Sequence, residues 1–79
     1  MAGYFGNQDK KSIVLLLDNG IASLKDDVKE GEKDAETLWF NYRKLHEVLY
    51  GQGEYLLSIT NKMRFEKRLT TVKKMLEKL

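Results

Sequence analysis

The fold is decided by residues 14–49, VLLLDNGIASLKDDVKEGEKDAETLWFNYRKLHEVL, where apolar or small residues recur at alternating spacings of three and four. The positions in this series are Val14, Leu17, Ile21, Leu24, Val28, Gly31, Ala35, Leu38, Tyr42, Leu45 and Leu49. This spacing is the heptad pattern of helices that pack against other helices. Because 33% of the residues are charged, a chance series of this length would include charges, and this one includes none. The sequence therefore predicts an all-α fold with coiled-coil-like heptad packing.

Length and composition indicate one small helical domain. The chain has 79 residues without proline or cysteine, so long helices are favoured and a disulfide is excluded. We predict a flexible arm over residues 1–8 and a single helical domain over residues 9–79. A core of this size supplies only roughly 3–5 kcal/mol of net stability. Self-association, as a homodimer or a larger assembly, or a protein partner is therefore expected.

Glycines mark the expected helix boundaries. Gly31 offers the left-handed conformation that closes many helices, and Gly51 and Gly53 flank a second stop. We predict helices over about 9–29, 33–50 and 54–79, arranged as a helical hairpin or a three-helix bundle. A continuous helix through Gly31 is the alternative at the first boundary.

The tripeptide Asp18-Asn19-Gly20 favours a different local structure. Asn-Gly between apolar stretches is typical of a β-hairpin turn. The residues that follow it, 21–25, lack aromatic side chains and are poor in β-branched ones, and an isolated strand pair is marginal in water. We therefore predict a helix here, in which Gly20 marks a close helix crossing.

Several apolar residues lie outside the heptad series and are candidates for binding a partner. They are Leu15, Leu16, Phe40, Leu56, Ile59 and Met63. On a helix these side chains point away from the predicted core or into charged surroundings. The alternative is that other segments of the same chain cover them.

Basic residues gather near the carboxyl end of the chain. From residue 62 onward there are seven basic and two acidic residues, a net charge of +5, whereas residues 1–61 carry −3. Arg64, Lys67, Lys74 and Lys78 recur at helical spacing and form a basic edge suited to phosphates or an acidic partner. The alternatives are a solvated helix face and a face paired with the acidic segment 26–36.

Other function classes receive no support. The single histidine, His46, has no nucleophile or metal-ligand pattern around it, so we expect no catalytic residue, metal or cofactor. The longest apolar run, residues 13–17, is far shorter than a membrane span. The amino-terminal residues lack a secretory pattern, so we expect a cytoplasmic protein.

The sequence is most consistent with a non-enzymatic protein-protein interaction module, either regulatory or an adaptor. It would self-associate and bind a partner through its exposed apolar helix faces. The alternative is an accessory protein that binds nucleic acid without sequence specificity through the basic edge. The chain's overall charge of only +2 makes nucleic acid the less favoured partner.

Overall fold

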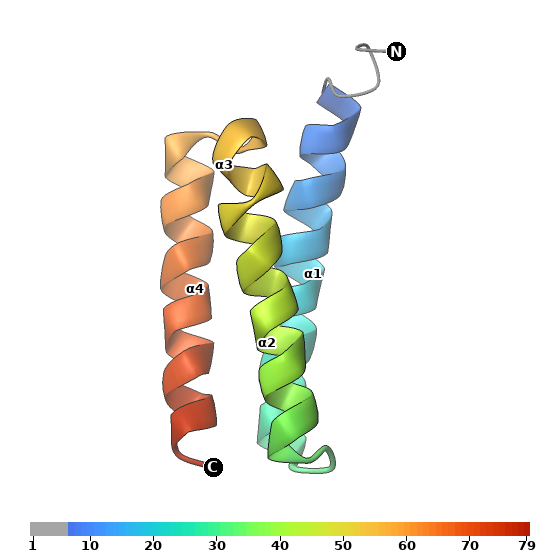
Figure 1. Cartoon of the computed structure of the whole chain (residues 1–79), viewed down its shortest axis with the longest axis vertical. Coiled ribbons are helices and arrows are strands. Elements are labelled where there is room, and N and C mark those ends of the chain that lie inside the picture. Colours follow the sequence, from blue (N-terminus) through green and yellow to red (C-terminus); the bar gives the residue numbers. More distant parts are fainter. Residues whose placement is uncertain (1–6) are drawn as a thin grey trace.

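The computed structural model of the chain describes residues 7–79, which form four helices and no strand. The helices are α1 (Asn7–Glu30), α2 (Ala35–Tyr50), α3 (Gln52–Leu56) and α4 (Ile59–Glu77). Helices α1, α2 and α4 lie side by side as an up-down-up bundle, with α1 and α4 running in the same direction (Figure 1). Short helix α3 joins α2 to α4 at one end of the bundle. The all-α prediction is confirmed, and the arrangement is a three-helix bundle rather than a hairpin.

The chain reverses at Gly31, as its sequence predicts. Gly31 has φ +72° and its N–H donates to the carbonyl of Asp27 at 3.2 Å. Asp34 then caps α2, because its carboxylate accepts a hydrogen bond of 3.0 Å from the N–H of Thr37. The heptad series therefore belongs to two antiparallel helices, and its members at the turn, Gly31 and Ala35, are exposed.

Helix α1 continues through residues 18–20 without interruption, so the β-hairpin alternative is wrong. Gly20 instead lies where α1 meets α2. A Cβ atom at Gly20 would lie 2.6 Å from Cδ2 of Leu45. The close helix crossing predicted at this glycine is thus confirmed.

The predicted third helix over 54–79 is wrong in one respect, because it is two helices. Leu57 is extended, with φ −90° and ψ 144°, and separates α3 from α4. Ser58 then starts α4 by accepting a hydrogen bond from the N–H of Asn61 at 3.2 Å. A serine of this kind offers the backbone an alternative to continuing the helix. Helix α3 also begins at Gln52, so only Gly51 interrupts the chain between α2 and α3.

The amino-terminal boundary also differs from the prediction. Helix α1 begins at Asn7, so residues 7–8 of the predicted arm are helical. The remaining part of that predicted arm, residues 1–6, lies outside the described residues.

The core runs along the axis shared by α1, α2 and α4. Its buried members are Ile13, Leu17, Ile21, Leu24, Val28, Leu38, Tyr42, Leu45, Leu49, Phe65, Leu69, Val72 and Leu76. Most members of the heptad series are buried, and Val14 is partly buried against them. Helix α4 supplies the largest fully buried side chain, Phe65. Within residues 7–79, no helix is both long enough and apolar enough to cross a membrane.

Candidate functional site

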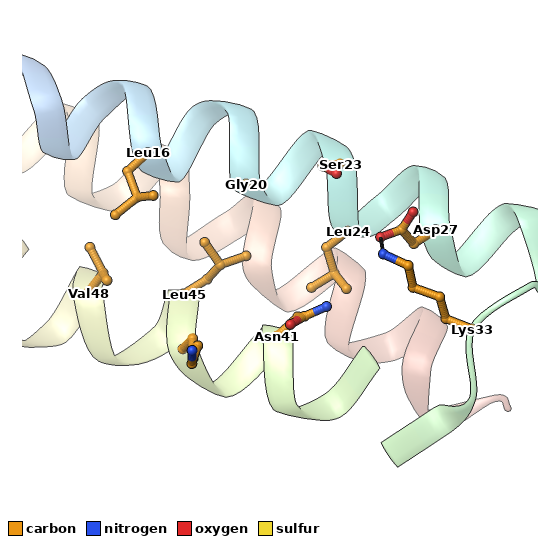
Figure 2. A pocket seen from close by; sticks show the side chains of 10 residues that line it. Leu16, Gly20, Ser23, Leu24, Asp27, Lys33, Asn41, Leu45 and Val48 are labelled. Atoms are coloured by element: carbon orange, nitrogen blue, oxygen red, sulfur yellow. Dashed lines mark hydrogen bonds and ion pairs between the residues drawn. The ribbon is translucent and has the colours of Figure 1, made fainter. Parts of the chain in front are cut away.

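A groove lies between α1 and α2, and we call it the α1–α2 groove. Its volume is 370 Å³. It is lined by Leu16, Gly20, Ser23, Leu24, Asp27, Lys33, Asn41, Lys44, Leu45 and Val48. Figure 2 shows Leu16 and Val48 facing each other at one end, and the ion pair between Lys33 and Asp27, 2.9 Å long, at the other. The groove thus has an apolar end and a charged end.

The groove exists because α1 presents short side chains to α2 in the middle of the contact. Gly20 and Ser23 follow Leu16 at helical spacing, and Leu45 fills only the space directly over Gly20. From Leu16 to Asp27, α1 rises by about 16 Å, at 1.5 Å per residue. A helix of about three turns has the length to lie in this groove. Leu16 remains 50% exposed at its apolar end.

The apolar residues predicted to bind a partner do not form a single face. Leu15 is 58% exposed and lines a different hollow of 540 Å³, together with Lys10, Lys11 and Val14. Phe40 is exposed on the outer side of α2, where the ammonium of Lys44 lies 4.7 Å from its ring centroid. These side chains therefore offer separate contact points around the bundle.

The predicted residues near the start of α4 divide into two groups. Ile59 is 79% exposed and Met63 is 64% exposed, as expected for side chains turned away from the core. Leu56 is partly buried and packs against the core, so its assignment to the exposed face is wrong. The reason is the interruption at Leu57, which takes α3 out of line with α4.

The predicted basic edge is fully exposed along α4. Arg64, Lys67, Lys74 and Lys78 are all exposed. The structure adds two lysines that the sequence analysis missed, Lys25 and Lys29 of α1. Both line a groove of 330 Å³ between α1 and α4, which we call the α1–α4 groove. Their spacing of four residues on α1 was visible in the sequence, but only the packing of α1 beside α4 connects them with the basic edge.

One ion pair bridges the two helices of this groove. Arg68 of α4 donates to Oδ1 of Asp18 at 2.5 Å and to the Asp18 carbonyl at 3.2 Å. Its guanidinium also lies 5.8 Å from the ring centroid of Phe65. Arg68 therefore fixes the position of α4 beside α1.

The opposite side of α4 packs against a row of aromatic rings on α2. The ring centroids of Trp39 and Tyr42 are 5.6 Å apart, those of Tyr42 and His46 6.0 Å, and those of His46 and Tyr50 4.5 Å. Burial, followed by the negative charge of Glu77, raises the pKa of Tyr42. His46 is an exposed member of this row. Among residues 10–79, no three His, Asp or Glu side chains cluster closely enough to hold a metal ion.

Comparison with known proteins identifies no relative. No protein-family model, no curated protein and no solved structure matches the chain significantly. Its function must therefore be inferred from the two grooves and the exposed side chains around them.

Proposed function

We propose that this protein is a small, non-enzymatic helical interaction module that self-associates through the α1–α2 groove. The observation that supports this proposal is the groove itself, which is open to solvent and whose exposed apolar surface comes mainly from Leu16, 50% exposed, with the partly buried Val48 opposite it. Covering such apolar surface is favourable, at roughly 25 cal/mol per Å². A small bundle with a limited core gains stability by doing so.

A second copy of this chain fits the groove because the groove has an apolar end and a charged end, and two copies can place like ends together. Closed dimers use the same surface on both copies. With a two-fold axis parallel to the bundle, the Leu16–Val48 ends of both copies meet. The Lys33–Asp27 ion pairs then lie together at the other end, where they remain accessible to water. The two α1–α2 pairs form a four-helix arrangement of the kind that is common among helical proteins.

Phe40, Ile59 and Met63 lie outside the α1–α2 groove and are exposed. In the proposed dimer they remain available to a different protein. Exposed aromatic and long apolar side chains are frequent at the centres of protein interfaces. We therefore propose them as contact points for such a partner, with Phe40 as the anchor.

The experiment is light scattering across a protein concentration series, at low and high salt, on the natural chain and two matched variants. Leu16→Ser removes an apolar side chain from the groove, whereas Leu15→Ser removes the same side chain one residue earlier, outside the groove. We expect a concentration-dependent dimer that Leu16→Ser weakens at least tenfold, since about 1.4 kcal/mol corresponds to a factor of ten. Leu15→Ser is expected to leave the dimer unchanged.

Two results would contradict the proposal. A natural chain that stays monomeric throughout the series shows that the groove does not bind a second copy. Equal weakening by Leu15→Ser and Leu16→Ser shows that the contact lies elsewhere on α1. Phe40→Ala is expected to leave the dimer intact, because Phe40 lies outside the α1–α2 groove, and the proposed role of Phe40 fails if this variant also leaves the capture of partner proteins unchanged.

A further inference from the structure

The face formed by α1 and α4 carries a concentration of positive charge that neither helix has alone. We call it the cationic face and define it by its six exposed basic residues: Lys25, Lys29, Arg64, Lys67, Lys74 and Lys78. Among the side chains of residues 10–79, none of the six forms an ion pair with a carboxylate. From this face we infer a binding site for the phosphate backbone of a nucleic acid, without preference for sequence.

The acidic residues of α4 do not offset this charge. Glu66 and Glu77 are the only two acidic residues of α4. Burial, followed by Glu66, raises the pKa of Tyr50 on α2. Burial, followed by Glu77, raises the pKa of Tyr42 on the same helix. Both glutamates therefore lie on the side of α4 that faces α2. Of the carboxylates on α1, Asp18 is engaged by Arg68. Asp26 lines the α1–α4 groove and is the one that opposes an anion there.

The packing of the helices places lysines of α1 and lysines of α4 at matching heights along the bundle. Helices α1 and α4 run in the same direction (Figure 1), and the contact between Asp18 and Arg68 sets their register. Lys25 and Lys29 follow Asp18 by about 10 and 16 Å along α1, at 1.5 Å per residue. Lys74 and Lys78 follow Arg68 by about 9 and 15 Å along α4. Lys25 and Lys29 line the groove, and Lys74 and Lys78 lie at matching heights on α4.

The dimensions of this face fit a nucleic acid. Arg64 and Lys78 are separated by about 21 Å along α4. A DNA duplex carries about 12 phosphates over that length, at one charge per 1.7 Å. The six residues provide five ammonium groups and one guanidinium, which neutralise phosphates wherever these fall. The site is therefore suited to the backbone and not to the base edges.

An anionic membrane is the less suitable ligand. Peripheral membrane helices place large apolar side chains beside their lysines, so that these side chains enter the lipid. On α4 the exposed apolar residues within the helix are Ile59 and Met63, which lie in its first turns. The lysine pairs of Lys25, Lys29, Lys74 and Lys78 lie toward the other end, with Thr71 and Ala22 lining the groove near them. The distribution of side chains thus favours a soluble polyanion.

The test is the fluorescence anisotropy of a labelled, random-sequence DNA duplex longer than α4, titrated with the full chain over a range of salt concentrations. If all six residues contact phosphates, the logarithm of the binding constant falls with the logarithm of salt with a slope of about −5. The double variants Lys25→Gln/Lys29→Gln and Lys67→Gln/Lys74→Gln are each expected to reduce that slope by about 2. The control is Arg43→Gln, which removes one positive charge on α2 outside both grooves and is expected to leave the slope unchanged, so that the loss per charge removed can be compared with that in the double variants.

A gain-of-affinity variant separates this inference from misfolding. Asp26→Asn removes the carboxylate in the α1–α4 groove and is expected to raise the affinity about threefold, the effect of one unit charge roughly 6 Å from a phosphate in water. Circular dichroism of each variant confirms that the bundle is folded.

Four outcomes would overturn the inference: no binding at low salt, an unchanged slope in the α1 double variant, an equal loss per charge in the α2 control, or no gain from Asp26→Asn. Binding to phosphatidylserine vesicles in the absence of DNA binding would assign the cationic face to a membrane instead. None of these measurements depends on the α1–α2 groove, because Leu16→Ser leaves the cationic face intact.

Discussion

Gly20→Ala is the substitution that tests the helix contact at the centre of the bundle most directly. Away from any contact, alanine in place of a glycine within a helix stabilises it by about 1 kcal/mol. In this structure the new Cβ would lie 2.6 Å from Cδ2 of Leu45, so α2 or the Leu45 side chain must shift. Overpacking costs about 1–3 kcal/mol, and the cost is at the lower end here, because the atom that must move is the end of the Leu45 side chain, which lines the open α1–α2 groove. We therefore expect the two effects to cancel, so that Gly20→Ala changes the free energy of unfolding by less than about 1 kcal/mol.

A double-mutant cycle separates the two effects. Leu45→Val removes both Cδ atoms, including the one that a Cβ at Gly20 would meet. In that background Gly20→Ala should raise the free energy of unfolding by about 1 kcal/mol, because only the helix preference of alanine remains. The coupling between the two positions is then about 1 kcal/mol, which is within the range for residues in direct contact.

The assay is urea denaturation followed by far-UV circular dichroism, with all four proteins at one concentration because self-association contributes to apparent stability. A coupling below about 0.5 kcal/mol, the usual limit for independent sites, would refute the reasoning. Stabilisation of the natural chain by the full amount, about 1 kcal/mol, would refute it equally, since it would show that the Leu45 side chain moves aside at no cost.

Three further predictions concern the helix ends. Ser58→Ala removes the cap of α4 and should lower the free energy of unfolding by about 1 kcal/mol in the same assay. Gly31→Ala should also lower the free energy of unfolding by about 1 kcal/mol, because φ is +72° and alanine is strained there, although nothing lies within 4 Å of the new Cβ. Gly31→Asn should lower it less. Equal stability of all three proteins would contradict the strain argument. The hydrogen bond from Thr37 lowers the pKa of Asp34. The ionised cap therefore stabilises the fold fully above the ordinary pKa of an aspartate, and this stabilisation is lost as the pH falls through the lowered pKa. Asp34→Asn keeps the cap but does not titrate, so its stability should decrease less than that of the natural chain upon acidification to about pH 2.

The helical core could be predicted from the sequence because its signal is local and repeated. Leu17, Ile21, Leu24 and Val28 recur with the period of a helix, and each is buried. The boundary at Gly31 was also predictable from a local signal, since glycine adopts that backbone conformation without strain. The interruption at Leu57 was missed, because the cap at Ser58 is a single hydrogen bond between a side chain and the backbone within an otherwise helical pattern.

The candidate surfaces were less predictable than the core. The exposure of Leu15, Leu16 and Phe40 follows from their positions on single helices, and the structure agrees with it. Which side chains share a groove depends on how two helices pack, and a helical period carries no information about that. Lys25 and Lys29 therefore join the basic residues of α4 only in the folded bundle.

The contact between Asp18 and Arg68 joins residues 50 positions apart in the chain, whereas the α1–α2 groove needs only residues 16–48. Chain entropy makes contacts between distant residues slower to form than local ones. We therefore expect the α1–α2 hairpin to form before α4 packs against it, so that the lysines of α1 and α4 come together in the last step. A ligand bound to both α1 and α4 would in turn hold together the two ends of this long segment of chain and slow the dissociation of α4 from the rest of the bundle.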